Sequence, residues 1–410
     1  MTEASTMRTG PEAEATETAA DTLADAVIAQ LRGVIGERDG PVPLHEPEFS
    51  GAEWDMVRDT LDGGWVSSVG KYVDRFEADI AAACGTRHAV AVVNGTAALE
   101  VALIVAGVVP GDEVVMPALS FVATANAALH MGAVPHFADA SPVTLGLDPH
   151  ALGAHLERVA EMQGGVAVNR ETGRRITAVV PMHCFGLPVE MEALGAVAAR
   201  FGLVVVEDAA ESLGSLRGGQ PCGSFGRLAA LSFNGNKILT TGGGGAIVTD
   251  DAALARRAKH LTTTAKLAHR WAFDHDEAGF NYRMPNLNAA LGCAQLEQLA
   301  DRLARKRALA ARYAAAFAGF DGAAIQPAPP GTEPNFWLNT LVLAAENAGL
   351  RDALLEQCHA AGLLCRPVWT PLHRLAHLSH APRADLGVTE DLAARILSRP
   401  SSAGLAAPSA

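Results

Sequence analysis

The chain has 410 residues, of which 49% are hydrophobic and 19% are charged, and its formal net charge at pH 7 is −13. This length and composition fit a globular protein with one large domain and one smaller domain. The acidic balance argues against a nucleic-acid partner, although local arginines and backbone amides can still hold a small anionic ligand. The best uninterrupted apolar run, residues 101–109, is too short to cross a bilayer and ends at Pro110.

The cysteines and the N-terminus indicate the compartment in which the protein is found. The six cysteines form no C-x-x-C pair and lie in apolar or mixed segments, so we expect reduced thiols in or near the core. His45-Glu46 is followed by Pro47 and cannot begin a helical zinc motif, and we expect no metal site. The N-terminus lacks the cationic-then-apolar pattern of a signal peptide, which predicts a cytoplasmic protein.

The first part of the chain is predicted to be helical after a disordered start. Residues 1–20 are rich in Thr, Ala and Glu and have few large apolar groups, so we expect them to be disordered. Apolar residues at every fourth position predict a helix over 22–35: Leu23, Val27, Leu31 and Ile35. Helices are also predicted over 54–61 and 73–83, with a loop over 65–71 between them.

Strands and helices then alternate, which is typical of βαβ units and predicts an α/β fold with a mostly parallel sheet. The predicted strands are 89–93, 113–116, 133–137, 176–182 and 203–206, and the predicted helices are 97–108, 120–131 and 191–201. A long polar connection follows, and then a helix over 287–307, a strand region over 337–343 and a helix over 350–361.

We therefore expect a large ligand-binding domain over 21–300, which includes the N-terminal helices, a smaller α+β domain over 301–400 and a tail over 401–410. Ligands in parallel sheets collect at the carboxyl ends of the strands. Five residues lie at or just beyond the ends of predicted strands and become candidates for one site: Gly95, Phe121, His183, Asp208 and Ser232.

Lys237 is the residue around which this candidate site is organised. It lies between an apolar run that reaches Ser232 and a predicted strand over 246–249, close to the glycines at 242–245. A buried lysine loses proton affinity and becomes a nucleophilic amine, as Schiff-base chemistry requires. An ordinary lysine in a hairpin is the alternative interpretation of this segment.

If Lys237 carries the aldehyde cofactor pyridoxal 5'-phosphate, other residues can meet the further demands of that cofactor. Asp208, at the end of an apolar strand, can keep the pyridine nitrogen protonated. Phe121 offers a flat face for the ring, although a phenylalanine at this position can also be plain core. Glu211, one turn beyond Asp208, can face the ring hydroxyl, although both acids could equally cap a helix N-terminus.

The phosphate of such a cofactor needs amides and hydroxyls. Gly95 and Thr96 open a helix directly after a strand, where unpaired N–H groups and the helix dipole favour an anion. Ser232 can add a hydroxyl from the strand that leads to Lys237, or it can merely satisfy a backbone group. This combination of candidate cofactor-binding residues is much less common by chance than any one of them alone.

Several motifs give the chain a resemblance to a known family. The motifs are residues 94–99, 117–124, 207–212, 232–237, 242–245 and 279–283. The chain resembles the DegT/DnrJ/EryC1/StrS family of nucleotide-sugar aminotransferases, which implies the aspartate-aminotransferase-like fold of pyridoxal phosphate enzymes (fold type I). This similarity spans residues 45–300 and continues more weakly toward residue 400.

Segments 43–47, 65–71 and 371–375 are similar to the branch of legionaminic- and bacillosamine-pathway 4-aminotransferases. The resemblance implies transfer of an amino group from glutamate to a 4-keto-6-deoxy nucleotide sugar, in this branch a UDP-linked N-acetylated one. It also implies a homodimer with shared sites, in which Asn281 of one subunit reaches the cofactor phosphate of the other. Retention of Lys237 favours transamination over the dehydratases that carry histidine there, and Glu211 stands where many members have histidine or glutamine.

Other classes of function remain as alternatives. One is a cofactor-binding regulatory or sensor protein on the same fold, and another is a pyridoxal phosphate enzyme that acts on a different sugar or an aminocyclitol ketone. A nicotinamide-dependent enzyme is disfavoured because the first βα turn lacks G-x-G-x-x-G, and Ile238 excludes a P-loop around Lys237. The candidates for a sugar-nucleotide pocket are His183, His373, Arg374, Arg366 and the region of Trp271.

Overall fold

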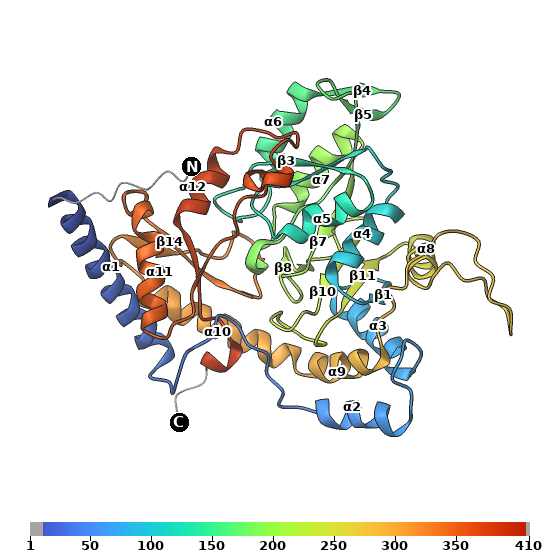
Figure 1. The fold of residues 1–410 in the computed structure, drawn as a ribbon, viewed down its shortest axis with the longest axis horizontal. Coiled ribbons are helices and arrows are strands. Elements are labelled where there is room, and N and C mark those ends of the chain that lie inside the picture. Colours follow the sequence, from blue (N-terminus) through green and yellow to red (C-terminus); the bar gives the residue numbers. More distant parts are fainter. Residues whose placement is uncertain (1–10, 407–410) are drawn as a thin grey trace, which may run out of the picture.

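A computed structural model of the chain describes residues 11–406 (Figure 1). The helices are α1 Pro11–Ile35, α2 Glu53–Asp62, α3 Lys71–Ala83, α4 Gly95–Val105, α5 Val122–His130, α6 Pro149–Val159, α7 Met191–Phe201, α8 Ala252–Thr262, α9 Asn286–Glu297, α10 Leu299–Ala316, α11 Arg351–Ala360 and α12 Gly387–Arg395. Short 3-10 turns occur at Cys184–Gly186, Ala345–Leu350, Leu372–Arg374, Ala376–Leu378 and Ala403–Ala406.

The strands build one large sheet and two small ones. They are β1 His88–Val92, β2 Glu113–Pro117, β3 Val134–Ala138, β4 Ala160–Gln163, β5 Val166–Asn169, β6 Arg175–Val179, β7 Val204–Asp208, β8 Leu216–Arg217, β9 Gln220–Pro221, β10 Leu228–Ser232, β11 Gly245–Thr249, β12 Ala323–Ile325, β13 Thr332–Glu333, β14 Asn339–Leu343, β15 Arg366–Pro367 and β16 Ile396–Arg399.

The large sheet confirms the predicted α/β class. Its main path runs β1-β11-β10-β7-β6-β2-β3, and the β4–β5 hairpin is attached to the edge of β6. All pairings from β10 to β3 along this path are parallel, whereas β11 is antiparallel to both of its neighbours. The antiparallel strand arises because the chain returns from β10 through a connection that contains Lys237, without a crossover helix.

Helices cover both faces of this sheet. The strands alternate between two cores: in β1, Val90 and Val92 pack on the side of α4 and α5, while Ala91 packs on the side of α3 and α9. Further along the sheet, α6 and α7 cover the second face over Val115 and Val179. Burial on both faces explains why these strands are short, continuous apolar runs.

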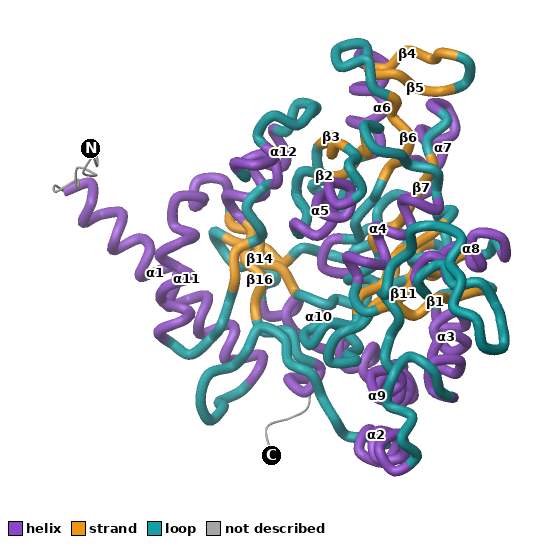
Figure 2. The backbone as a smooth tube through the Cα atoms, turned by 45° about the vertical axis from the view of Figure 1, so that its right-hand side comes forward, coloured by secondary structure: helices purple, strands orange, loops and turns teal. Residues whose placement is uncertain are grey.

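A smaller unit contains the four-stranded sheet β12-β14-β16-β15 and the helices α10 and α11 (Figure 2). Helix α1 also packs here: Val27 and Leu31 share one buried cluster with Leu309, Tyr313 and other residues of this unit. Figure 1 shows α1 beside α11 at the edge of the molecule. The N-terminal helix therefore lies against the small unit and does not join the large domain as predicted.

Three other predictions of local structure were wrong. Residues 11–20 belong to α1 and are not disordered, while residues 1–10 lie outside the described residues. The helix predicted over 287–307 is interrupted at Gln298, which separates α9 from α10. Residues 401–406 are not a loose tail, because Ser401 and Leu405 are buried against the small unit. Helix α6 and the β4–β5 hairpin were not predicted, although Asp148-Pro149 and the spacing of Leu152, Leu156 and Val159 are typical of a helix.

Two expectations about composition can also be compared with the structure. All six cysteines are buried free thiols, as predicted. Over residues 11–406, no helix combines the length and the apolar character that crossing a bilayer demands.

Candidate functional site

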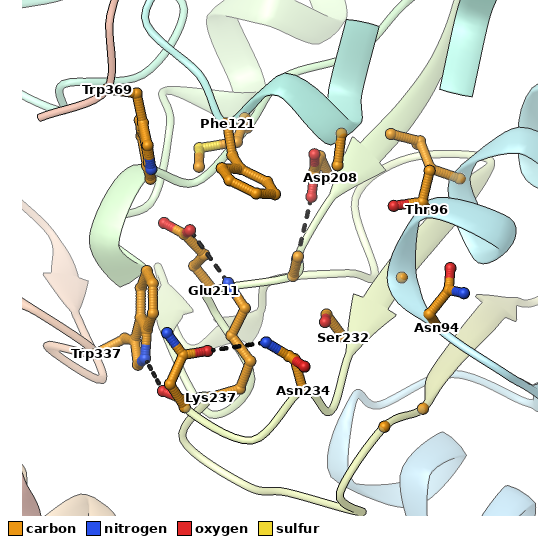
Figure 3. Close-up of a pocket in the computed structure, with 18 residues that line it drawn as sticks. Asn94, Thr96, Phe121, Asp208, Glu211, Ser232, Asn234, Lys237, Trp337 and Trp369 are labelled. Atoms are coloured by element: carbon orange, nitrogen blue, oxygen red, sulfur yellow. Dashed lines mark hydrogen bonds and ion pairs between the residues drawn. The ribbon is translucent and has the colours of Figure 1, made fainter. Parts of the chain in front are cut away.

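A cavity of about 340 Å³ opens beyond the carboxyl ends of β1, β7 and β10 (Figure 3). Its walls come from the N-terminus of α4, the turns after β2 and β7, the connection between β10 and β11, and two segments of the small unit. The lining residues are Asn94, Gly95, Thr96, Leu99, Phe121, Ala123, Met182, Asp208, Ala210, Glu211, Ser232, Asn234, Asn236, Lys237, Gly243, Gly244, Trp337 and Trp369.

Lys237 reaches into this cavity from the β10–β11 connection. Its side chain is 12% exposed, and its Nζ lies 3.2 Å from Oε1 of Glu211. The same Nζ lies 4.0 Å from the centre of the Trp337 ring, where the negative face of the indole attracts a cation. The amine is thus held between a carboxylate and an aromatic face.

Glu211 is buried and acts as the immediate partner of the lysine. Its Oε2 accepts a hydrogen bond of 2.8 Å from the N–H of Phe185, so that both carboxyl oxygens are engaged. Burial raises the pKa of Glu211, and the nearby Lys237 charge opposes this shift. The carboxyl is therefore a buried acid whose charge depends on the group beside it.

Asp208 ends β7 and points into the cavity (Figure 3). Its Oδ2 accepts a hydrogen bond of 2.7 Å from the Thr124 hydroxyl, and its Oδ1 accepts one of 3.2 Å from the N–H of Ala210. Because Thr124 donates to Asp208, the hydroxyl of Ser120, 2.8 Å away, must donate to Thr124. Burial raises the pKa of Asp208 despite these donors, so a cation in the cavity would favour its charged form.

The opposite wall is formed by the start of α4. The Asn94 side chain caps this helix by accepting the N–H of Ala97 at 2.8 Å, and Gly95 and Thr96 line the cavity at its first turn. Helix α4 can approach β10 closely only because residue 95 is glycine: a Cβ there would lie 2.8 Å from the Cβ of Ser232. The first turn of α4 and the Ser232 hydroxyl therefore converge on one place that suits a phosphate.

Aromatic side chains close the side of the cavity that faces α4. Figure 3 shows Trp337 and Trp369 across from Thr96 and Asn94, with Phe121 between. The ring of Phe121 lies 6.3 Å from that of Trp369 and is 50% exposed, so its face is free for a flat ligand. Trp337 and Trp369 come from the small unit, which makes the cavity a feature of the interface between the two units.

Most of the residues singled out in the sequence meet in this cavity: Gly95, Thr96, Phe121, Asp208, Glu211, Ser232 and Lys237. Asn281 does not line it; this residue is exposed, and its Oδ1 accepts from Arg283.

The residues suggested for a sugar-nucleotide pocket also lie elsewhere. His183 is fully buried and contacts Glu207 at 3.0 Å, so it cannot line the cavity. His373 and Arg374 both bind Glu390, and Arg366 contacts His359. Trp271 is 73% exposed on the connection between α8 and α9.

Sequence reasoning missed Thr124, Trp337 and Trp369 as parts of the site. Thr124 lies within a motif that was noted, but nothing in the sequence shows that its hydroxyl meets Asp208. The two tryptophans follow the site-forming segments by about one hundred residues or more and resemble core residues of the small unit. The aromatic pair Phe336-Trp337, set between Asn335 and Asn339, was the available signal.

One cluster outside the cavity has residue types that could bind a metal. His260, Asp276 and Glu277 lie near one another at the surface. His260 and Asp276 hydrogen-bond at 2.7 Å, and Glu277 binds Arg257. These side chains already neutralise each other, so the cluster adds nothing to the site.

The cavity fits pyridoxal phosphate by its donor set. It supplies an amine, an aspartate that needs a cationic partner, an exposed aromatic face and a helix N-terminus for a phosphate. On this fold, these features define a pyridoxal phosphate-dependent enzyme.

Comparison with known proteins specifies the family. The chain belongs to the DegT/DnrJ/EryC1/StrS aminotransferase family, whose model matches residues 47–409. It is 36% identical to the GDP-perosamine synthase of Caulobacter vibrioides over 365 residues, which cover 89% of this chain and 94% of that protein. The chain is thus an aminotransferase of this family.

Two further relatives and one solved structure agree with this assignment. A dTDP-4-dehydro-2,3,6-trideoxy-D-glucose 4-aminotransferase of Saccharopolyspora spinosa is 32% identical, with coverage of 82% of this chain and 85% of that protein. A UDP-N-acetyl-3-dehydro-alpha-D-glucosamine 3-aminotransferase of Acidithiobacillus ferrooxidans is 33% identical, with coverage of 79% and 82%. The structure of DesI in the presence of its TDP-sugar product superposes with a TM-score of 0.77, 31% identity and 88% coverage of both chains.

The Ser120–Thr124–Asp208 chain leads to a first prediction. Thr124→Val keeps the side-chain volume but removes the hydroxyl that donates to Asp208, so we expect kcat to fall about tenfold as a charge-assisted hydrogen bond is lost. The measurement is steady-state kinetics together with the affinity for pyridoxal phosphate. Thr60→Val is the matched control, because Thr60 is equally buried and bonds only to Val57 O; equal losses in both variants would contradict the role.

Proposed function

We propose that this protein transfers the amino group of glutamate to the C4 ketone of a 4-keto-6-deoxy nucleotide sugar, giving a 4-amino sugar. The observation that carries the proposal is the Lys237 amine, held 3.2 Å from Glu211 in a cavity that also contains Asp208. Within the family, we place the chain in the branch that handles UDP-linked, N-acetylated sugars. Its segments 43–47, 65–71 and 371–375 support this placement.

Each residue of the site has a defined task in this proposal. Bound pyridoxal phosphate supplies an aldehyde for the amine and an electron-withdrawing ring that stabilises negative charge on the reacting carbon. The Lys237 amine would hold the cofactor aldehyde, and its Nζ can also carry a proton. Asp208 would face the ring nitrogen, with Thr124 and Ala210 holding its carboxylate in place.

The remaining residues position and enclose the reactants. Gly95, Thr96 and Ser232 would hold the phosphate, Phe121 would pack on the ring, and Glu211 would lie near the ring hydroxyl; all five line the cavity. Trp337 and Trp369 cover the other side and exclude water from the reacting atoms. Their flat faces also suit the apolar face of a sugar ring.

We further propose that two copies form a homodimer with shared sites in the cytoplasm. Between α8 and α9 the chain forms a loop that projects from the body (Figure 1) and carries the exposed side chains of Leu267, Trp271 and Phe273. Large exposed apolar groups on one projecting segment are typical of an interaction site. Asn281 follows this segment and is exposed, so it can reach the phosphate in the partner's cavity.

The substrate is tested by incubation with glutamate and a panel of nucleotide sugars that differ in nucleotide and in the position of the ketone. We expect amination of 4-keto sugars, fastest with UDP-linked N-acetylated ones, detected by product mass. A product formed only from a 3-keto sugar, or only from GDP-linked sugars, would contradict the proposal. A shift of the cofactor band with glutamate but no product from any sugar would favour the sensor alternative.

The role of Lys237 is tested by borohydride reduction of the purified holoenzyme. We expect the reduced cofactor to be found on the peptide that contains Lys237. In Lys237→Arg this label should be lost and turnover should fall at least about 10³-fold, because a guanidinium cannot replace the amine nucleophile. Lys259→Arg, at a partly exposed lysine that pairs with Glu77, is the control; near-normal turnover in Lys237→Arg would refute the assignment.

The shared site is tested by mixing two inactive variants, Lys237→Ala and Asn281→Ala. In a mixed dimer, one of the two sites combines an intact Lys237 from one subunit with an intact Asn281 from the other. Random exchange of subunits should therefore restore about a quarter of wild-type activity, as expected for two-fold symmetric sites. If activity does not return although mass analysis shows mixed dimers, Asn281 does not act across the interface.

A further inference from the structure

The Nζ of Lys237 has two close neighbours that come from distant parts of the chain. Glu211 follows β7 in the large domain, and Trp337 precedes β14 in the small unit. The location of the amine therefore depends on how these two segments are held relative to each other. One buried side chain, that of Asn335, joins them directly.

Asn335 is 0% exposed and uses its side-chain amide on both segments. Its Oδ1 accepts the N–H of Trp337 at 2.7 Å. Its Nδ2 donates to the carbonyl oxygens of Glu211 at 2.9 Å and of Leu213 at 3.0 Å. Both N–H groups of the amide are thus used, and the two residues that contact Lys237 are linked through a single amide group.

A second set of contacts returns from Asn335 to the Glu211 carboxylate. The N–H of Asn335 donates to the Ser215 hydroxyl at 2.9 Å, which donates to the carbonyl of Gly186 at 2.7 Å. Gly186 has a positive φ of 90° and packs so closely that a Cβ there would lie 1.9 Å from Asn335 Oδ1. The preceding residue, Phe185, is the one whose N–H holds Glu211 Oε2.

Trp337 is also fixed at its ring and at its carbonyl. The indole N–H donates to the carbonyl of Asn236, next to Lys237, at 2.6 Å. The carbonyl of Trp337 accepts a hydrogen bond of 2.7 Å from the fully buried Lys306. The aromatic face over the amine therefore has little freedom once Asn335 holds its backbone.

We propose that Asn335 is a positioning residue that presets the place of the Lys237 amine by tying Glu211 to Trp337. The inference rests on the proposed function, in which this amine is the nucleophile. Preset placement matters because a misplacement of about 1 Å can cost about 10²-fold in rate. It also matters because the carboxylate and the aromatic face are the two groups that contact the amine, at 3.2 Å and 4.0 Å.

The first test uses the apoprotein, so that it does not depend on any reaction of the cofactor. Competitive labelling with acetic anhydride, followed by mass analysis of peptides, gives the acetylation rate of Lys237 at a fixed pH. In Asn335→Ala we expect this rate to rise about fivefold or more, because the amine is no longer held against the Glu211 carboxylate and becomes more accessible to the reagent.

Asn339→Ala is the matched control. Asn339 lies on the neighbouring strand β14, is 2% exposed and donates from Nδ2 to the Ser401 hydroxyl, so its loss disturbs the same region without touching Glu211 or Trp337. We expect the acetylation rate of Lys237 in this variant to match that of the wild type. Equal rates in the wild type, Asn335→Ala and Asn339→Ala, with all three folded, would overturn the inference.

The second test uses the holoenzyme. In Asn335→Ala we expect the pH midpoint of the visible cofactor band to shift and kcat to fall about tenfold or more while KM for the sugar changes little. If Asn335→Ala does not fold, Trp337→Phe replaces it, since it keeps an aromatic face but loses the bond to Asn236; it should give a smaller change in the same direction. An unchanged midpoint and kcat in the folded variant would contradict the proposal.

The two tests separate failure of this inference from failure of the proposed function. If the wild-type protein aminates no sugar, the acetylation experiment still reports whether Asn335 controls the amine. If the wild type is active but Lys237 responds equally to both asparagine substitutions, the function stands and the positioning role of Asn335 is wrong.

Discussion

The structure depends on the placement of one partly buried amine, that of Lys237, between a carboxylate and an aromatic face. In a site of low polarity, an unpaired charge is costly, and each charge must be met by an opposite charge or by hydrogen bonds. The pairing of β10 with β7 satisfies this requirement: Ala230 lies opposite Asp208 in the parallel ladder, so the chain that leaves β10 toward Lys237 starts beside the acids that end β7. The sheet thereby brings the segment that carries the amine close to the acids.

Two adjacent acids on β7 show how strand geometry separates structure from chemistry. Glu207 points away from the cavity, where it accepts hydrogen bonds from the N–H groups of Gly223, Phe225 and Gly226. Asp208, one residue later, points into the cavity and accepts a hydrogen bond from the Thr124 hydroxyl. Successive side chains of a strand face opposite sides, so a shift of one residue would exchange a scaffold acid for a catalytic one.

The cavity belongs to both units of the molecule. The large domain supplies the amine, the acids and the start of α4, whereas the small unit supplies Trp337 and Trp369. A buried cluster that includes Met182, Phe185 and Leu338 joins the two units directly behind the cavity. The aromatic wall is therefore held by core packing, and its position is coupled to the way the two units meet.

The sequence by itself determined the α/β class and nearly all the chemistry on the large domain. Strand ends can be read from short apolar runs, and the carboxyl ends of parallel strands share one edge, so Gly95, Asp208 and Ser232 could be placed together without coordinates. Lys237 could be singled out because strand-forming segments flank it. These inferences use only local pattern and a general rule of sheet topology.

Only the tertiary structure decided the rest. Helix α1 lies against the small unit because its apolar face fits the cluster around Leu309 and Tyr313, and an amphipathic pattern does not say which surface will cover it. The side chains of Thr124, Asn335 and Trp337 meet the site through contacts between segments that are remote in sequence. Such contacts depend on how the two units pack against each other. This packing produces no periodic pattern in the sequence.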